Sequence, residues 1–195
     1  MNPILPLGSK ILTGRIVALE PLEERHHGDL IRAAADPAIW TYIPLDMSKG
    51  FAARLGGVVE EMAKGTQLTF AVRRLSDGTV VGSTSYLAIT PKDAKVEIGA
   101  TWYVAGAQGT AVNPEAKYLL LENAFAAGYN RVEFKTDSKN ARSRAALKKL
   151  GAVEEGILRG HMWMPQGYFR DSVYFSILAA EWPRVKDALE RRLAA

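Results

Sequence analysis

The chain has 195 residues, 48% of them hydrophobic, with a formal net charge of +4 at pH 7 and no cysteine. A chain of this size supports one hydrophobic core, so we expect a single domain over residues 1–195. The lack of cysteine excludes disulfide frameworks, Cys-ligated metal sites and a catalytic protein thiolate. No segment has the length of an apolar transmembrane helix or the charge order of a secretory signal, which predicts a cytoplasmic protein without membrane contact.

The histidines and basic residues indicate neither a metal site nor a nucleic-acid site. His26 and His27 are adjacent and His161 is distant, so their spacing is not that of metal ligands. The densest basic clusters, in segments 142–149 and 191–192, have helical spacing without interleaved aromatic residues. We interpret them as solvated surface. Binding to DNA or RNA is the alternative, and it predicts a steep salt dependence.

The first part of the chain predicts one strand followed by two helices. The strand is expected over residues 15–19 and the first helix over residues 23–35, closed by Asp36 and Pro37. The second helix is expected from Phe51 to Lys64, before Gly65. Its apolar face is predicted to consist of Leu55, Val58, Val59 and Met62.

Strand patterns dominate the middle of the chain. Segments 68–73 and 79–88 are predicted to form an antiparallel hairpin around the turn Ser76-Asp77-Gly78. A further strand begins at Lys95, and its period-two alternation predicts that Glu97 points away from the apolar face. The residues expected on that apolar face are Val96, Ile98, Ala100, Trp102 and Val104.

A loop of small residues, 105–112, follows this strand and leads into a helix. Asn113 is the expected N-cap and Pro114 the expected first-turn proline. The helix is predicted to end at Gly128 after a buried stripe that contains Leu120, Leu121, Ala124, Phe125 and Ala127. A strand over residues 131–137 would complete a βαβ unit and therefore a parallel strand pair.

The loop and helix start over residues 105–113 form a candidate anion site. Unpaired backbone N–H groups and the positive end of the helix dipole meet at such a point. The segment lacks the Lys and Ser/Thr of a P-loop and the glycine spacing of a dinucleotide fold, so a different nucleotide ligand is implied. An ordinary tight connection between strand and helix is the alternative.

The next helix is expected to start after its N-cap Asn140 and to end at Gly151. With this segment the chain resembles the GCN5-related N-acetyltransferases, most closely the RimJ/RimL-like branch that acetylates the N termini of ribosomal proteins. The resemblance spans nearly the whole chain. It is carried, in order, by Val96-Glu97-Ile98-Gly99, by Gln108 to Asn113 with Glu115-Ala116, by Asn140-x-x-Ser143 with Lys149-Leu150-Gly151, and by Asp171 to Ser176 before Glu181-Trp182.

The resemblance implies a fold, a reaction and a set of cofactor contacts. The fold is a mixed α/β (α+β) architecture with a mostly antiparallel central sheet, one splayed parallel strand pair and flanking helices. The reaction is direct transfer of an acetyl group from acetyl-CoA to a primary amine of a peptide N terminus or a small molecule. The implied coenzyme A contacts are Trp102, Tyr103, Val104, Gln108, Gly109, Thr110, Ala111, Val112, Asn113, Asn140, Ser143 and Lys149.

Direct attack by an amine needs a proton acceptor and a group that protonates the leaving thiolate. Glu97 is the expected base; a surface carboxylate paired with a lysine is the alternative. Ser143 is the expected acid; a serine bonded locally to backbone is the alternative. Three positions depart from the family pattern: Ala111 stands where the loop usually has glycine, Asn113 where it usually has glycine or alanine, and Leu147 where many relatives have a tyrosine that serves as the acid.

The acceptor and the oligomeric state are less determined by the sequence. We expect Trp40, Tyr42, His161 and Trp163 to contact the acceptor, with ordinary packing as the alternative. Asp46 is the only acid between Trp40 and Phe51, which does not favour a polycationic acceptor. The alternative to an enzyme is a catalytically idle acyl-CoA-binding or interaction protein of the same fold. The sequence also leaves open whether the acyl group is acetyl or longer. The apolar stripe Trp182, Val185, Leu189 and Leu193 packs either inward or in a homodimer.

Overall fold

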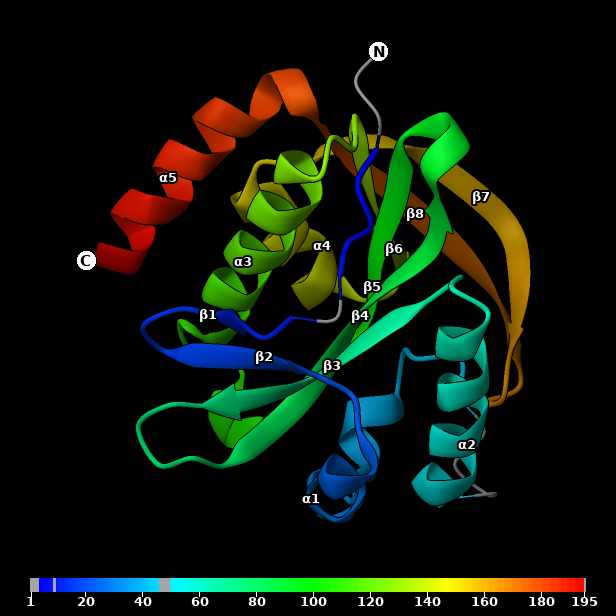
Figure 1. The fold of residues 1–195 in the computed structure, drawn as a ribbon. Helices are drawn as coiled ribbons and strands as arrows, with labels where there is room; N and C mark the ends of the chain where they lie inside the picture. Colours follow the sequence, from blue (N-terminus) through cyan, green and yellow to red (C-terminus); the bar gives the residue numbers. More distant parts are fainter. Residues whose placement is uncertain (1–3, 9, 46–49, 195) are drawn as a thin grey trace.

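A mixed eight-stranded sheet forms the centre of the structure, a computed structural model that describes residues 4–8, 10–45 and 50–194 (Figure 1). Within the described residues the strand order is β1-β2-β3-β4-β5-β6-β8-β7, and only β5 and β6 pair in parallel. This confirms the predicted sheet. The strands are β1 (Leu12–Thr13), β2 (Val17–Pro21), β3 (Leu68–Arg74), β4 (Val80–Thr90), β5 (Lys95–Tyr103), β6 (Arg131–Asp137), β7 (Val153–Met164) and β8 (Tyr168–Leu178).

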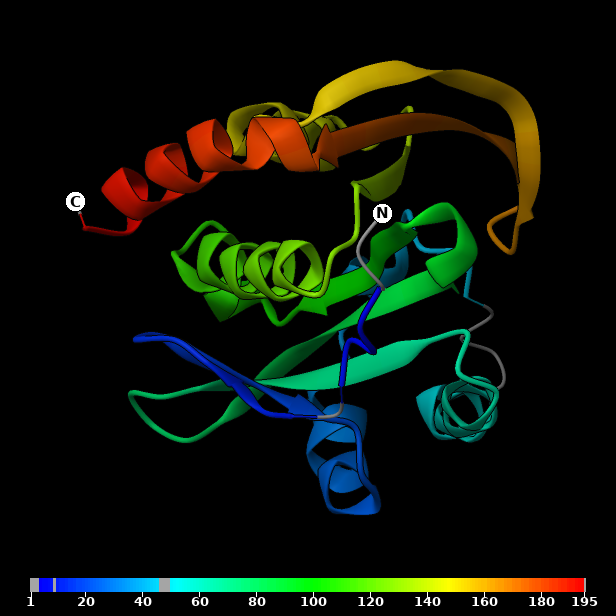
Figure 2. The ribbon, with the colours of Figure 1, turned by 45° about the horizontal axis from the view of Figure 1, so that its top comes forward.

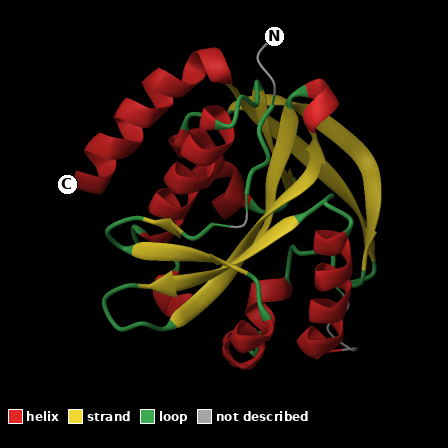
Figure 3. Ribbon diagram, in the orientation of Figure 1, coloured by secondary structure: helices red, strands yellow, loops and turns green. Residues whose placement is uncertain are grey.

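Helices lie on both sides of the sheet (Figures 2 and 3). They are α1 (His27–Ala33), α2 (Gly50–Ala63), α3 (Val112–Ala126), α4 (Ala141–Leu150) and α5 (Trp182–Ala194). The main hydrophobic core contains residues of α3, α4, α5 and the strands they cover. A second core joins α1 and α2 to the other face through Trp40, Leu55 and Trp102. Among the described residues, no helix combines the length and apolarity needed to cross a bilayer.

The parallel pair β5–β6 is short and opens toward its carboxyl ends. Pairing joins Lys95 to Arg131, Val96 to Val132 and Glu97 to Glu133, and no register continues beyond that point. The edge of β5 from Ile98 to Tyr103 therefore has no strand partner on the β6 side within the described sheet. This is the splay that the resemblance implied.

A β-bulge in β5 overturns part of the predicted alternation. Trp102 pairs with Ser83 and Gly99 pairs with Ser85, so two residues of β5 oppose Thr84 alone. Ala100 lies at the bulge with a φ of 47°. An extra residue reverses the facing of all later side chains. Tyr103 instead of Trp102 therefore joins Ile98 in the main core, and Trp102 faces the second core.

The predicted helices are present, with corrections at two positions. Val59 was expected on the buried face of α2 but is 46% exposed, whereas Leu55 and Val58 are buried. Asn113 is not the N-cap, because α3 begins at Val112, two residues before the expected start at Pro114, with Ala111 in the capping position. Thr110 Oγ1 accepts the Val112 N–H at 3.3 Å, which starts the helical turn early. The expected helix over residues 23–35 begins as a 3₁₀ turn before α1.

Both ends of α4 and the buried face of α5 agree with the sequence-based predictions. Asn140 caps α4, with its Oδ1 accepting the Ser143 N–H at 3.0 Å, and Gly151 ends that helix at a φ of 96°. The stripe on α5 packs inward: Val185 and Leu189 are buried in the main core, and Trp182 Nε1 donates to Glu122 Oε2 at 3.0 Å.

Candidate functional site

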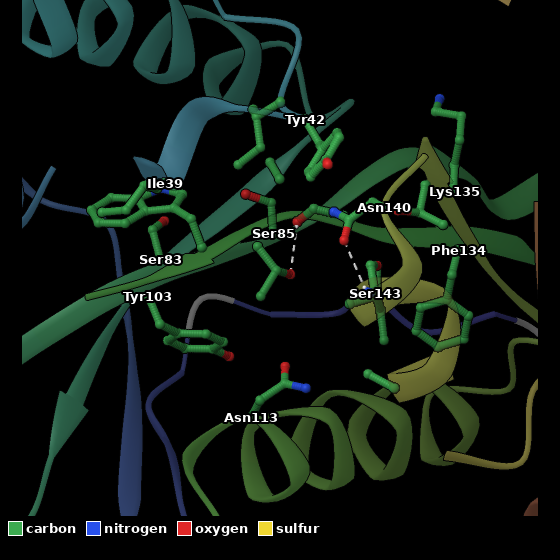
Figure 4. Close-up of a pocket in the computed structure, with 18 of the residues that line it drawn as sticks. Ile39, Tyr42, Ser83, Ser85, Tyr103, Asn113, Phe134, Lys135, Asn140 and Ser143 are labelled. Carbon is green, nitrogen blue, oxygen red and sulfur yellow. Dashed lines mark hydrogen bonds between the residues drawn. The ribbon is translucent and has the colours of Figure 1, made fainter. Parts of the chain in front are cut away.

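A cleft of 740 Å³ opens where β5 and β6 diverge (Figure 4). Its walls come from β5, β6, the loop before α3, the first turns of α3 and α4, and the segment around Trp40. The structure brings most of the predicted site residues to this one cleft. Those that line it are Trp40, Tyr42, Glu97, Trp102, Tyr103, Gln108, Gly109, Thr110, Asn113, Asn140 and Ser143.

Glu97 lies at the last paired position of β5, where the two strands separate. Its side chain is nearly buried, and Oε2 lies 3.3 Å from Lys135 Nζ on β6. A Cβ added at Gly99 would come within 2.8 Å of Glu97 Oε1, so glycine leaves the space that this carboxylate occupies. Glu97 thus lines the cleft, as expected of the base, and forms an ion pair with a lysine, as in the alternative interpretation. Its role as base stays a prediction.

The loop before α3 presents backbone N–H groups at one end of the cleft. Gly109 has a φ of 77°, a left-handed conformation that favours glycine. Thr110 Oγ1 donates to Ala107 O at 2.8 Å, which holds the loop in shape. Within the described part of the chain, the N–H groups of Gly109, Thr110 and Ala111 donate to no acceptor. Together with the start of α3 they provide donors suited to an anion.

Ala111 adopts the right-handed conformation, with φ −74° and ψ −6°. An alanine is therefore unstrained at the position where the family usually has glycine. The side chain of Gln108 braces the loop: Nε2 donates to Tyr103 O at 2.8 Å, and Oε1 accepts from Arg142 Nη1. Gln108 therefore connects the end of β5 to α4.

The start of α4 faces the loop across the cleft. Asn140 and Ser143 both line the cleft, and Figure 4 shows the hydrogen bond between the Asn140 side chain and the Ser143 backbone. Leu147, one turn further along α4, is buried and also lines the cleft. No proton-donating side chain stands at that position, which leaves Ser143 as the hydroxyl of α4 in the cleft.

Lys117, which the sequence analysis did not single out, lies inside the cleft wall. It is 7% exposed, and its Nζ donates to Thr101 Oγ1 on β5 at 2.8 Å and lies 5.9 Å from the Phe134 ring centroid on β6. Among the described residues no carboxylate lies within 4.0 Å of it. Desolvation by burial lowers the pKa of Lys117 to about 7. The sequence signal that could have found Lys117 is its helical spacing: it lies four residues after Asn113, on the helix face that continues to the buried Leu120.

Tyr103, a predicted coenzyme A contact, also brings an unpaired hydroxyl to the cleft wall. Its hydroxyl is buried and has no hydrogen-bond partner among the described residues, and desolvation raises its pKa. Tyr103 and Asn113 approach the cleft from β5 and from α3 (Figure 4). A buried hydroxyl without a partner on the wall of a cleft is suited to a hydrogen bond from a ligand.

The described lining of the cleft is strongly basic. Glu97 is its one acidic residue, and Asp46 lies outside the described residues. The basic residues in the lining are Arg54, Lys117, Lys135, Lys139, Arg142, Arg170 and Arg192. Low-dielectric walls of one charge sign attract ligands of the opposite sign. The cleft therefore favours anionic ligands.

Several predicted contacts lie outside the cleft lining. His161 and Trp163 are on exposed parts of β7, where Trp163 packs on Phe169 at 5.1 Å. His161 Nδ1 lies 2.9 Å from Ser172 Oγ. The other predicted residues that do not line the cleft are Val104, Ala111, Val112 and Lys149. Trp40 lines the cleft but also packs on Trp102 at 5.3 Å, so it has a structural role too.

Comparisons with known proteins agree with this fold. The family model described as acetyltransferase (GNAT) domain matches residues 17–153. A solved structure of a candidate acetyltransferase from T. thermophilus is 39% identical and covers 94% of this chain and 97% of that one, with a TM-score of 0.83. RimJ from Mycobacterium smegmatis, solved in complex with CoA-disulfide, is 24% identical, covers 94% of this chain and 91% of that one, and shares the fold with a TM-score of 0.79.

Among curated proteins, YdaF of Bacillus subtilis (strain 168), named as a candidate ribosomal N-acetyltransferase, is 32% identical over 109 residues. That alignment spans 55% of this chain and 58% of YdaF, so the similarity extends over little more than half of the relative.

Proposed function

Because the chain belongs to the GNAT acetyltransferase family, we propose that it is an acetyl-CoA-dependent N-acetyltransferase acting as a single domain. The transfer runs directly to a primary amine, without a covalent enzyme intermediate. The observation that carries the proposal is the divergence of β5 and β6 after Glu97 and Glu133, which leaves one strand edge free inside a basic cleft. An extended chain with amide groups can pair with such an edge.

The residues of the cleft suit both the pyrophosphate and the pantetheine arm of acetyl-CoA. The free N–H groups of Gly109, Thr110 and Ala111 would hold the pyrophosphate at the start of α3. The Tyr103 hydroxyl and the free edge of β5 would bond the pantetheine arm. When bound, acetyl-CoA supplies an activated acyl group on a thioester. The complex of M. smegmatis RimJ with CoA-disulfide supports this assignment by analogy of fold.

Glu97 is the proposed proton acceptor for the attacking amine, directly or through a water. Its nearly buried carboxylate stands at the point where the strands separate, and Lys135 holds it at 3.3 Å. A base placed at the reacting centre contributes about 10²- to 10⁴-fold to such reactions.

Ser143 and Lys117 are the groups proposed to meet the negative charge that develops on the sulfur. Ser143 presents a hydroxyl from α4, and Leu147 leaves no tyrosine to compete with it. The Lys117 ammonium lies between β5 and β6 without a carboxylate partner among the described residues. A cation in a dry wall stabilises negative charge more strongly than one in water.

The proposed acceptor is a protein N terminus or a small primary amine. The ribosomal N-acetyltransferase name of YdaF supports the first, and the basic lining disfavours polycations such as polyamines. A second function, an idle acyl-CoA binder, is favoured by the ion pair between Glu97 and Lys135 and by Leu147 in place of a tyrosine.

Release of free thiol from acetyl-CoA, followed with a panel of primary amines, separates the two functions. Amine-dependent release, with the acetylated amine identified by mass spectrometry, is the expected result. Coenzyme A binding in the micromolar range without release for any amine, peptides included, would instead establish the idle binder. Acyl-CoA thioesters of increasing length, tested with the best amine, define the acyl group.

A further inference from the structure

Arg170 is a buried cation on the wall of the cleft. It lies on β8, is 4% exposed, and belongs to the lining of the same cleft as Glu97. Its Nη2 is shielded from solvent and has no hydrogen-bond partner among the described residues. A buried guanidinium with an unused donor is unfavourable unless something else supplies an acceptor.

Neighbouring side chains fix the orientation of this guanidinium. Arg170 Nε donates to Ser172 Oγ at 2.9 Å, and Ser172 is fully buried. The same hydroxyl lies 2.9 Å from His161 Nδ1 on β7. Because the hydroxyl accepts from Arg170, it is free to donate to His161. The network uses the Nε of the guanidinium and leaves Nη2 without a partner, and no hydrogen bond from Nη1 is found among the described residues.

The nearby carboxylates are already engaged elsewhere. The negative charges of Asp137 and Glu97 attract the Arg170 guanidinium from a distance, but neither carboxylate lies within the 4.0 Å that defines an ion pair. Asp137 accepts from the Lys139 N–H at 2.8 Å and from the Tyr168 hydroxyl at 2.6 Å. Glu97 is paired with Lys135. Arg170 therefore has its charge only partly compensated, and desolvation lowers its pKa from the ordinary arginine value.

The position of Arg170 assigns it to the acceptor side of the cleft. Its charge interacts with Glu97, the proposed base, whereas the cation bonded to the phosphate-side loop is Arg142, through Gln108. Arg170 pairs with Met162 across β7 and β8, and Met162 also lines the cleft. A group bonded to Arg170 would thus lie close to the amine that Glu97 deprotonates.

We propose that Arg170 forms an anion-binding subsite for the acceptor, so that the preferred substrate is a primary amine with a carboxylate close to it. This inference rests on the proposed N-acetyltransferase function. A planar guanidinium with two free nitrogens matches a carboxylate in geometry and charge. The carboxylate is either the α-carboxylate of a free amino acid or the acidic side chain of a residue at a peptide N terminus.

Matched acceptor pairs test the inference. Each pair exchanges the carboxylate for an amide: glycine and glycinamide for the free amino acid, and peptides starting with Asp or Asn for the protein N terminus. Because a neighbouring carboxylate also raises the pKa of the amine, kcat/KM is expressed per concentration of unprotonated amine. The ratio of kcat/KM values within a pair is expected to favour the carboxylate at least tenfold, through KM. The pair that shows the preference identifies the source of the carboxylate. Equal values in both pairs would overturn the inference.

Variants identify the residue responsible. Arg170→Met is expected to reduce the carboxylate-to-amide ratio to near one, while the KM for acetyl-CoA stays within about twofold. Arg170→Lys keeps the charge and is expected to retain part of the preference, which also guards against a folding defect in the Met variant. Arg142→Gln is the matched control: it is expected to weaken the binding of acetyl-CoA and to leave the carboxylate-to-amide ratio of kcat/KM unchanged. If Arg170→Met weakens coenzyme A instead, Arg170 serves a cofactor phosphate and the inference is wrong.

A binding measurement separates this inference from the proposed function. Calorimetric titration of the coenzyme A complex with N-acetylglycine and with N-acetylglycinamide needs no turnover. Tighter binding of the acid, lost in Arg170→Met, supports the subsite even if no amine is acetylated, in which case only the proposed function fails. Equal binding of acid and amide in the wild-type protein would overturn the subsite even if amines are acetylated.

Discussion

Lys117 Nζ donates a 2.8 Å hydrogen bond to Thr101 Oγ1 and so connects α3 to β5 next to its bulge. Thr101 Oγ1 in turn lies 2.7 Å from Thr84 Oγ1 on β4. Among the described residues, the Lys117 ammonium is thereby held inside the wall of the cleft by one threonine hydroxyl and the nearby Phe134 ring, without a carboxylate partner. Such burial is unfavourable for folding and favourable for stabilising negative charge in a ligand.

Replacing Lys117 with Met is expected to stabilise the protein in a pH-dependent way. Burial lowers the pKa of Lys117 to about 7 from an unfolded value of 10.5, so the unfolded chain binds the extra proton between these pH values. The destabilisation by Lys117, of the order of 5 kcal/mol at most, is full below pH 7 and disappears as the pH rises toward 10.5. Urea unfolding at pH 6.5 and pH 9.5 measures it.

The exposed Lys92→Met provides the control, because it removes a lysine that is not buried in the wall of the cleft. Lys117→Met is also expected to lower kcat by about 10²-fold, as for the loss of one preorganised donor. A variant that is neither more stable at pH 6.5 nor slower in turnover would exclude a buried functional ammonium at this position.

Replacing Glu97 with Gln tests the proposed base. The amide keeps the shape of the side chain but accepts no proton, so kcat is expected to fall by about 10²- to 10⁴-fold while coenzyme A affinity stays within twofold. Glu133→Gln is the matched control, because Glu133 pairs with Glu97 on the neighbouring strand and its carboxylate bonds Arg131 at 2.8 Å. Unchanged turnover in Glu97→Gln would remove the base assignment.

Replacing Glu115 with Gln is expected to destabilise the fold without changing the chemistry. The buried carboxylate of Glu115 accepts the backbone N–H groups of Arg15, Ile16 and Val17 at 2.9, 2.7 and 2.7 Å. An amide nitrogen cannot accept these bonds, which predicts a loss of about 2–4 kcal/mol in urea unfolding. Turnover of the folded fraction is expected to stay normal.

Glu190→Gln is the control for an exposed carboxylate, one that accepts a hydrogen bond from Tyr118. It should lower the free energy of unfolding by less than about 1 kcal/mol. Equal stability of the two variants would contradict the role of Glu115. The result also bears on the family motif Glu115-Ala116, since the structure explains this glutamate by its contacts to the β1–β2 turn rather than by a ligand.

The two small residues of the loop before α3 predict opposite outcomes. Gly109→Ala forces a Cβ into a left-handed backbone at a φ of 77°, so the loop should rearrange, with coenzyme A affinity falling about tenfold. Ala111→Gly restores the usual family residue at an unstrained position and should change affinity less than twofold. Calorimetric titration with coenzyme A measures both. A stronger effect of Ala111→Gly would mean that Ala111 distorts the loop.

The elements that the sequence predicted well are those with strong local signals. The βαβ unit from Lys95 to Asp137, the Asn140 cap and the stop at Gly151 follow from periodicity and capping chemistry. This unit also indicated an anion site in the loop, whereas the individual coenzyme A contacts on β5 and in the loop came from the resemblance to the N-acetyltransferase family.

Most of the misses have non-local causes. The bulge at Ala100 arises where two residues of β5 oppose Thr84, and Gly99 beside it is a local signal for a bulge that the predicted alternation did not use. It sends Trp102 to the second core, against the predicted alternation. Lys117 and Arg170 resemble ordinary surface cations in sequence, because their burial depends on strands that come together only in the folded sheet.

A crystal structure of the protein with bound coenzyme A tests the central claim most directly. We predict the pantetheine arm between β5 and β6, bonded to the free edge of β5, and the pyrophosphate on the N–H groups of Gly109, Thr110 and Ala111. The thiol end is expected within reach of Glu97 and Ser143. Coenzyme A bound at any other surface, or a pyrophosphate that makes no contact with this loop, would contradict the account.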